Sequence, residues 1–261
     1  MGGQSLFTTI AEFTPDDAEA GAGLALQDAS GRYLFFLSGS RHRCSPGELF
    51  YAGIGGHREA GEDWITCAHR EAREEIGTDI EIIAAASTWL VSHHGLVQRV
   101  ELRDRPRPLA LVEMIHPADS PRAGELYRIV VFRASLCGEP KQLPPEEVQG
   151  IIALTVSQVI RGIRERPTLL ELLTDGAAMV AGHERLDNRV RVYPLGTARA
   201  LAFLLDDVDV GLADDCAHNH GGGEILGGPG AGLQSAGMRC SGGTCPPVRP
   251  DGEHSFSDTG G

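Results

Sequence analysis

The stretch GHREAGEDWITCAHREAREEIGT, residues 56–78, decides the fold of this chain. Apolar residues recur within it at spacings of three and four, which predicts a short helix ending at Gly77. The helix carries Glu71, Glu74 and Glu75 on neighbouring turns, off the predicted apolar stripe. Like charges at this spacing destabilise a helix by roughly 0.2–0.5 kcal/mol per pair, so the cluster is typical of a site that binds a cation.

A glycine-rich turn, residues 53–56, precedes this helix. Glycine lets a backbone approach another group closely, so a carbonyl of this turn could point at the same cation. Arg70 is spaced to pair with Glu74 one turn further on. Hard divalent cations such as Mg²⁺ prefer carboxylate oxygens and often bridge them to substrate phosphates. The segment therefore indicates a metal-assisted phosphate chemistry.

The segment resembles the Nudix box, a glycine followed at set spacings by Glu, Arg-Glu, Glu-Glu and a second glycine. One position departs from that pattern, because Thr78 stands where an aliphatic residue is usual. The matching positions here are Gly56, Glu62, Arg70, Glu71, Ala72, Glu74, Glu75 and Gly77.

The resemblance implies a hydrolase that cuts a phosphoanhydride in a nucleoside diphosphate linked to another group, using water and Mg²⁺ or Mn²⁺. It implies that Glu74 and Glu75 bind the metal, with the Gly55 carbonyl as a third protein ligand. Glu71 would either bind the metal or orient and deprotonate the attacking water. Arg70 would hold the carboxylates in place. Phosphoryl transfer depends mainly on positioning and charge neutralisation, which agrees with this division of roles.

Many members of the family use a further acid from a later loop. The acidic turn before the apolar run at residues 148–154 is the matching place here, and Glu147 is our candidate, with Glu146 close behind. The alternative is an acidic pair that only flanks a strand. Which glutamate acts as the general base stays open.

Composition narrows the class of protein. The chain has 261 residues, 41% of them hydrophobic, which is enough for a packed core. A net charge of −13 argues against a nucleic-acid binder, since these usually carry a basic face. No apolar run has the length of a membrane span, so we expect no membrane partner. The six cysteines form no persuasive disulfide or zinc pattern, which favours a cytoplasmic protein.

We predict an α+β fold of the Nudix type, with a mixed β-sheet between helices. Residues 1–165 would form the Nudix domain, including an inserted hairpin at about 89–125. That insert carries Trp89, His93, His94 and several arginines, and could be a substrate lid, a homodimer contact or a plain extra hairpin. Residues 166–206 would form a small helical appendage, in which Arg191 and Tyr193 either reach the substrate or only pack. Residues 207–261 are rich in glycine and lack periodicity, which predicts disorder.

The substrate is not defined by these patterns beyond a small nucleotide-linked diphosphate. A second hypothesis is a regulatory protein that keeps the fold and binds a nucleotide without turnover. The intact set of glutamates favours the enzyme. A regulator of this kind would also be expected to carry a basic DNA-binding domain, and the sequence shows none.

Overall fold

The computed structural model describes residues 8–15, 18–116, 122–141, 143–182 and 186–207. The tail predicted to be disordered lies, from residue 208 onward, outside the described residues. All described residues fall in one structural unit, Met1–Cys216. No helix in the described ranges has the length and apolar character to cross a membrane.

The strands of the described residues build one mixed sheet of twelve strands. They are β1 (Ala20–Gln27), β2 (Tyr33–Ser38), β3 (Glu48–Ala52), β4 (Gly55–His57), β5 (Ile80–Ile83), β6 (Thr88–Val91), β7 (Val97–Val100), β8 (Ala110–Ile115), β9 (Leu126–Leu136), β10 (Val148–Leu154), β11 (Ala178–Ala181) and β12 (Arg191–Pro194). The helices are α1 (Ile10–Phe13), α2 (Trp64–Ile76), α3 (Val156–Gly162), α4 (Leu169–Thr174) and α5 (Gly196–Asp207).

The main path through the sheet is β11-β10-β2-β1-β9-β8-β6-β7. Strands β1 and β9 pair in parallel over eight positions, from Ala20 opposite Arg128 to Gln27 opposite Ser135. Four strands attach beside this path, because β3 pairs with β2, β12 with β3, β4 with β1, and β5 with β9. The pairing of β4 with β1 brings the glycine turn onto the centre of the sheet.

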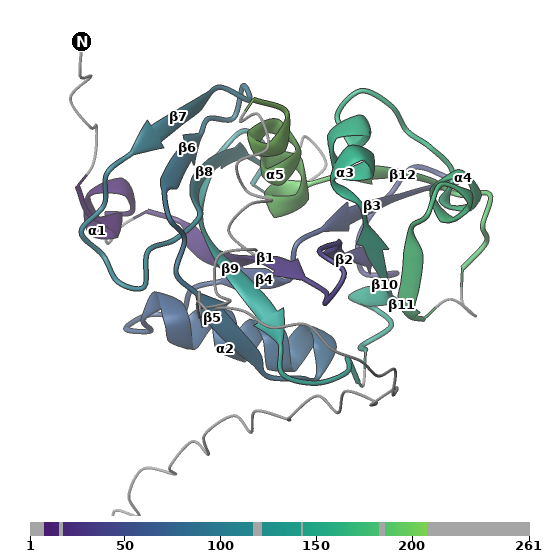
Figure 1. Ribbon diagram of the computed structural model, residues 1–261, viewed down its shortest axis with the longest axis horizontal. Coiled ribbons are helices and arrows are strands. Elements are labelled where there is room, and N and C mark those ends of the chain that lie inside the picture. The colour runs from purple at the N-terminus through teal and green to yellow at the C-terminus, as the bar shows by residue number, and fades with distance from the viewer. Residues whose placement is uncertain (1–7, 16–17, 117–121, 142, 183–185, 208–261) are drawn as a thin grey trace, which may run out of the picture. The chain divides into compact units, whose positions relative to one another are not determined.

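Helices cover both faces of the sheet, with α2 on one side and α5 on the other (Figure 1). Each side has its own hydrophobic cluster. The cluster on the α2 side includes Ala68, Ala72 and Ile76, and the cluster on the α5 side includes Leu201 and Leu204. The predicted α+β fold, a mixed sheet between helices, is therefore confirmed.

Local sequence accounts for several of these elements. The hairpin around residues 28–31 is the β1–β2 connection, where the Asp28 carboxylate accepts hydrogen bonds from the backbone N–H groups of Ser30 and Arg32. Helix α3 begins with a capping box between Thr155 and Gln158. The predicted insert contains the antiparallel pair β6–β7 and strand β8, which pairs with β9.

Residues 166–207 contribute strands as well as helices. Besides α4 and α5 they contain β11, which pairs with β10, and β12, which runs parallel to β3. Helix α5 packs against β1, β3, β6, β7 and β8. This part of the chain therefore completes the sheet and covers one of its faces.

Candidate active site

Helix α2 presents the box residues, and its sequence explains where it begins and ends. The Asp63 carboxylate accepts hydrogen bonds from the backbone N–H groups of Ile65 and Thr66, which makes it the N-cap. Gly77 ends the helix in the left-handed conformation, with φ of 61°. The predicted helix and its terminator are thus confirmed.

Glu71 lies on the buried face of α2, which the predicted apolar stripe did not anticipate. Its relative exposure is 9%, and it is buried beside Cys67, Ala68 and Ala72. The cause is Gly56, because a Cβ added there would lie 2.5 Å from the Glu71 carboxylate. The first glycine of the box therefore leaves the space that this glutamate fills.

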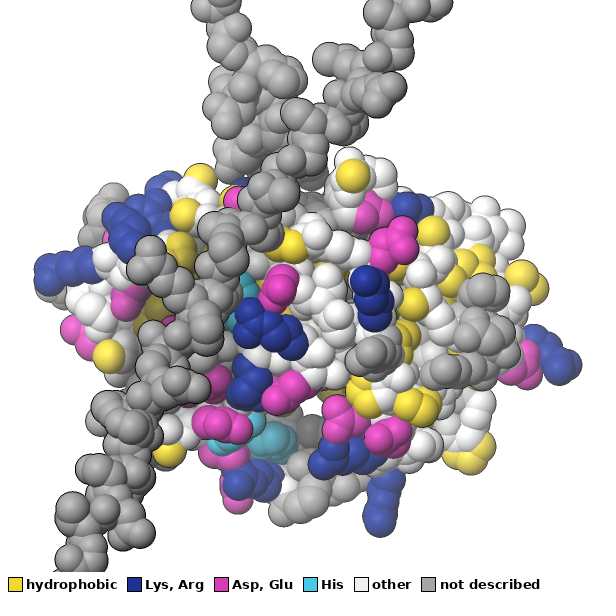
Figure 2. All heavy atoms as spheres, turned by 90° about the horizontal axis from the view of Figure 1, so that it is seen from below, with side chains coloured by type: hydrophobic (Ala, Val, Ile, Leu, Met, Phe, Trp, Pro, Cys, Tyr) yellow, Lys and Arg dark blue, Asp and Glu magenta, His cyan; other side chains and the backbone are white. Residues whose placement is uncertain are grey.

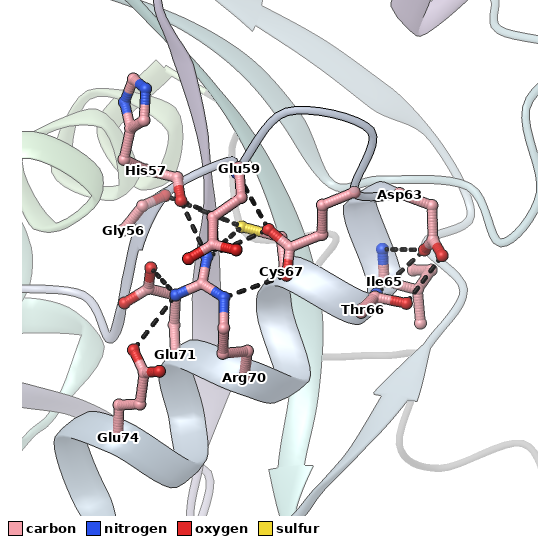
Figure 3. A network of polar contacts seen from close by, with 11 residues as sticks. Gly56, His57, Glu59, Asp63, Ile65, Thr66, Cys67, Arg70, Glu71 and Glu74 are labelled. Carbon is pink, nitrogen blue, oxygen red and sulfur yellow. Dashed lines mark hydrogen bonds and ion pairs between the residues drawn. The ribbon is translucent and has the colours of Figure 1, made fainter. Parts of the chain in front are cut away.

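Arg70 is the centre of the polar network around the box. Its guanidinium binds the Glu62 carboxylate through Nε and Nη2 at 3.0 Å each, and the Glu71 Oε1 atom through Nη1 at 2.7 Å. Nη1 also contacts Glu74 Oε2 at 3.1 Å, and Nη2 donates to the His57 carbonyl at 2.8 Å. Figure 3 shows the Glu71 and Glu74 carboxylates pointing at this guanidinium. The predicted pairing of Arg70 with Glu74 is present, and Arg70 ties the helix to the glycine turn.

Glu75 approaches the same glycine turn from the next position of the helix. Its Oε2 atom accepts a hydrogen bond from the Gly55 N–H at 2.9 Å. Burial raises the pKa of Glu75 to about 8, and the neighbouring charges of Glu71, Glu147 and Glu74 act in the same direction. Burial also raises the pKa of Glu71, against the opposing effect of Arg70. The site thus holds several carboxylates close together, which disfavours their charged forms. A bound cation would offset this repulsion.

Glu147 reaches this cluster from the loop before β10. Its carboxylate forms an ion pair with Arg41, and its charge is close enough to raise the pKa of Glu75. The loop is held in place by backbone hydrogen bonds, from Gly39 N–H to the Glu147 carbonyl at 2.8 Å and from Arg41 N–H to the Glu146 carbonyl at 2.7 Å. Glu146 itself is exposed. Of the two predicted loop acids, Glu147 is the one that the fold brings toward the box.

A cleft of about 860 Å³ borders the glycine turn. Gly53, Gly55 and Gly56 form part of its wall. The rest of its lining comes from several strands, the loop after β2 and the start of α5: Ala22, Phe36, Arg41, His42, Arg43, Phe50, Ala52, Met114, His116, Tyr127, Ile129, Tyr193, Leu195, Gly196 and Thr197. The carboxylates of α2 therefore lie next to a space that can hold a small ligand.

Several lining residues were not singled out from the sequence. His42 follows β2, and burial lowers its pKa, so the imidazole is mostly neutral at pH 7. His116, which follows β8, and Tyr127 on β9 flank the cleft, with ring centroids 5.3 Å apart. None of these positions carries a local motif, because strand pairing alone brings them together.

The insert contributes to the cleft through residues other than those predicted. Within the described ranges the lining takes Met114 and His116 from this region, whereas Trp89 packs against the core on the α5 side. The ring centroids of His93 and His94 are 3.8 Å apart, and neither residue belongs to the cleft lining. Arg191 likewise does not line the cleft, whereas Tyr193 does.

The donor set fits a hard divalent cation. All candidate ligands are oxygen atoms, and the contacts above engage one oxygen each of Glu71, Glu74 and Glu75. Within the described part of the chain, no three His, Cys, Asp or Glu side chains already converge as a metal site. The Arg70 Nη1 atom donates to Glu71 and Glu74, whereas Glu75 accepts from the Gly55 N–H. On the face seen in Figure 2, acidic and basic side chains lie interspersed, which agrees with such local pairing.

One family model matches this chain, and several solved structures are similar to it. The family model of the NUDIX domain matches residues 18–173. No curated protein sequence matches the chain. Similar solved structures include a MutT NUDIX hydrolase from Burkholderia pseudomallei, with 20% identity, a TM-score of 0.36, and coverage of 54% of this chain and 85% of that one. An Ap4A hydrolase from C. elegans has 17% identity and a TM-score of 0.36, covering 55% and 80%. An ADP-ribose pyrophosphatase from Streptococcus suis has 14% identity and a TM-score of 0.37, covering 72% and 90%.

The matched segment contains the glycine turn, α2 and the Glu147 loop, and it spans more than half of the chain. The chain therefore belongs to the NUDIX family. Its class is a Nudix-type pyrophosphohydrolase, and members of this family generally use divalent metal ions.

Proposed function

We propose that the protein hydrolyses a phosphoanhydride bond in a nucleoside diphosphate linked to another group, by attack of water on phosphorus. The observation that carries this proposal is the gathering of Glu71, Glu74, Glu75 and Glu147 around the glycine turn beside the cleft. A surface helix without a ligand would gain nothing from burying one of these carboxylates and crowding the others against it. The expected substrate is small, and its phosphates would meet the carboxylates at the glycine turn.

We infer that Glu71, Glu74, Glu75 and the Gly55 carbonyl hold Mg²⁺ or Mn²⁺. When bound, the ion would neutralise phosphate charge and lower the pKa of water. Oxygen ligands of this kind suit both ions, so the donor set does not choose between them. The Gly55 N–H donates to Glu75, which holds that carboxylate against the turn whose carbonyl we propose as a ligand.

Arg70 would act as a positioning residue. It fixes Glu71 and Glu74 through Nη1 and binds the His57 carbonyl, so it keeps both glutamates in register with the glycine turn. Glu71 is then the first candidate for a ligand or for the group that orients and deprotonates water. Glu147 is the second candidate for the base, because its charge is close enough to raise the pKa of Glu75 and its Arg41 partner lines the cleft.

The test is a panel of nucleoside diphosphate derivatives with Mg²⁺ or Mn²⁺, read as phosphate release after coupling to a phosphatase. Loss of an interaction with a catalytic metal is worth several kcal/mol, so Glu75→Gln should lower kcat/KM by about 100-fold or more. Gln keeps an oxygen for the Gly55 N–H, so the far-UV circular dichroism spectrum should not change. The matched control is Glu81→Gln, an exposed glutamate on β5, which should keep full activity.

Isothermal titration calorimetry separates metal binding from turnover. The wild-type protein should bind Mn²⁺ in the presence of a nucleoside diphosphate, and Glu75→Gln should bind it more weakly. Wild-type turnover in Glu75→Gln, or no uptake of either ion by the wild-type protein, would refute the proposal. A cytoplasmic location and a homodimer remain predictions from the sequence.

A further inference from the structure

The cleft extends from the glycine turn to a group of four aromatic rings. Phe36, His42, Phe50 and Tyr193 all line it. The ring centroids of His42 and Phe50 are 5.0 Å apart, those of Phe36 and Phe50 are 6.0 Å apart, and those of Phe50 and Tyr193 are 6.4 Å apart. These spacings are those of interacting aromatic pairs, so the four rings form one continuous surface.

Two of these rings keep part of their surface available to a ligand. Phe36 and Phe50 are buried, with exposures of 6% and 7%, and form the floor. His42 and Tyr193 are only partly buried, and both belong to the cleft lining. A planar group that enters this part of the cleft would therefore meet the rings of His42 and Tyr193 first.

Tyr193 is held rigidly in this position. The Arg166 guanidinium lies over its ring, 4.5 Å from the centroid, and Arg166 is itself paired with Glu48 at 2.7 Å. The backbone of Tyr193 is fixed too, since β12 runs parallel to β3 with Tyr193 opposite Phe50. A ring held in this way loses little further freedom when a ligand stacks on it.

The part of the cleft wall that includes Tyr193 and the start of α5 comes from beyond the segment that matches the NUDIX domain, which ends at residue 173. It is nevertheless attached directly to the glycine turn. Thr197, at the start of α5, is buried, and its side chain occupies the space left by Gly23 and Gly53. A Cβ at Gly53 would lie 2.8 Å from Thr197 Cβ. The glycine turn thus contacts the box glutamates on one side and the start of α5 on the other.

We propose that Tyr193 and His42, whose rings both pack against Phe50, stack on the nucleobase of the substrate. The inference rests on the proposed function and deepens it, because it assigns the base to this part of the cleft and the phosphates to the glycine turn. Aromatic rings stack on any nucleobase, so Tyr193 supplies affinity for a base as such. Arg43, which lines the same cleft, adds positive charge for the phosphates.

Binding measured without metal tests the inference apart from catalysis. The probes are AMP, GMP, CMP and UMP, each titrated by calorimetry in EDTA, with ribose 5-phosphate as the probe that lacks a base. Base stacking measured by substitution corresponds to roughly 5- to 150-fold in affinity. Tyr193→Leu, which keeps an apolar side chain but removes the ring, should weaken the tightest mononucleotide by that factor. Tyr193→Phe, which keeps the ring, should bind it within about 2-fold.

Two controls make the result specific. Ribose 5-phosphate should bind equally to the wild-type protein and to Tyr193→Leu. Phe203→Leu removes an aromatic ring from α5 that does not line this cleft, and it should leave mononucleotide binding unchanged. Equal thermal unfolding of Tyr193→Leu and Tyr193→Phe would show that the ring, rather than the fold, accounts for the difference.

The outcomes separate this inference from the proposed function. Unchanged mononucleotide affinity in Tyr193→Leu, or equal loss for ribose 5-phosphate, would overturn the inference even if the protein hydrolyses nucleotides. Base-dependent binding that Tyr193→Leu abolishes would support it, even if no nucleotide in the panel were hydrolysed.

Discussion

Replacing Arg70 by alanine should destabilise the folded protein far more than replacing Arg73, although both arginines lie on α2. The side chain of Arg70 is 22% exposed, and the side chains of its partners Glu62 and Glu71 are 9% and 11% exposed. Without it, two largely buried carboxylates lose their only described cation, and breaking a buried pair in this way costs about 3–5 kcal/mol. Because Arg70 keeps some contact with water, we expect the lower end, about 3 kcal/mol.

Arg73 provides the matched control. It pairs with Asp79 at 2.6 Å, but the two side chains are 51% and 58% exposed. Exposed pairs contribute about 0–1 kcal/mol, so Arg73→Ala should change the free energy of unfolding by no more than that. Arg70→Lys should fall between the two, since lysine keeps the charge but cannot bind Glu62 through two nitrogens.

The assay is urea unfolding followed by tryptophan fluorescence and circular dichroism, with the free energy extrapolated to zero denaturant. A double-mutant cycle between Arg70→Ala and Glu62→Gln isolates the central contact, and its coupling should be about 1.5–3 kcal/mol, as for a hydrogen bond to a charged group. If Arg70→Ala and Arg73→Ala lost the same stability, the view of Arg70 as the centre of the network would be wrong.

Three further predictions concern Gly56 and the N-cap of helix α2. Gly56→Ala should lower the free energy of unfolding by about 1–3 kcal/mol and should also lower activity, because the new Cβ would meet the Glu71 carboxylate. The control is Gly138→Ala, whose new Cβ would lie 3.3 Å from its nearest neighbour, the Thr78 hydroxyl oxygen, and which should lower the free energy of unfolding less in the same assay. Asp63→Ala should cost about 1 kcal/mol through loss of the N-cap, and Asp63→Asn clearly less, as thermal unfolding at pH 7 would show. Hydrogen bonds from Thr66 and Ile65 hold the pKa of Asp63 below its usual value, so the cap stabilises the fold above about pH 4, the value for the unfolded chain. As the pH falls through the lowered pKa of the folded state this contribution disappears, and the wild-type protein and Asp63→Ala should then converge; a constant difference from pH 7 to pH 2 would contradict this.

The box helix could be predicted from the sequence because its determinants are local. The terminating Gly77 and the pairing of Arg70 with Glu74 each depend on residues within about one turn of the helix. The burial of Glu71 could not, since it depends on the space beside Gly56, and that space exists only once β4 has paired with β1. An apolar stripe counted along one helix does not show that a charged side chain can be buried against a backbone.

The aromatic side of the cleft could not be predicted from the sequence for a related reason. Tyr193 and Phe50 lie opposite each other because β12 pairs with β3, and these strands are far apart in the sequence. Local patterns predicted a helical appendage over residues 166–206, and Gly196–Asp207 do form helix α5. They could not show that Thr197 fits over Gly23 and Gly53, because this fit needs three separate segments in contact.

The glycines of β1 and of the turn explain how the box and the start of α5 can both pack against the same strand. Gly21 accommodates the Tyr127 hydroxyl and the Gly56 carbonyl, and Gly23 accommodates Thr197. A side chain at either position would push β9, the turn or α5 away from β1. Small residues here let the box and the start of α5 approach the same strand, so that the proposed sites for the phosphates and the base share one cleft. The segment that matches the NUDIX domain carries the carboxylates, and the strand and helix that follow it close the space in which a substrate would be selected.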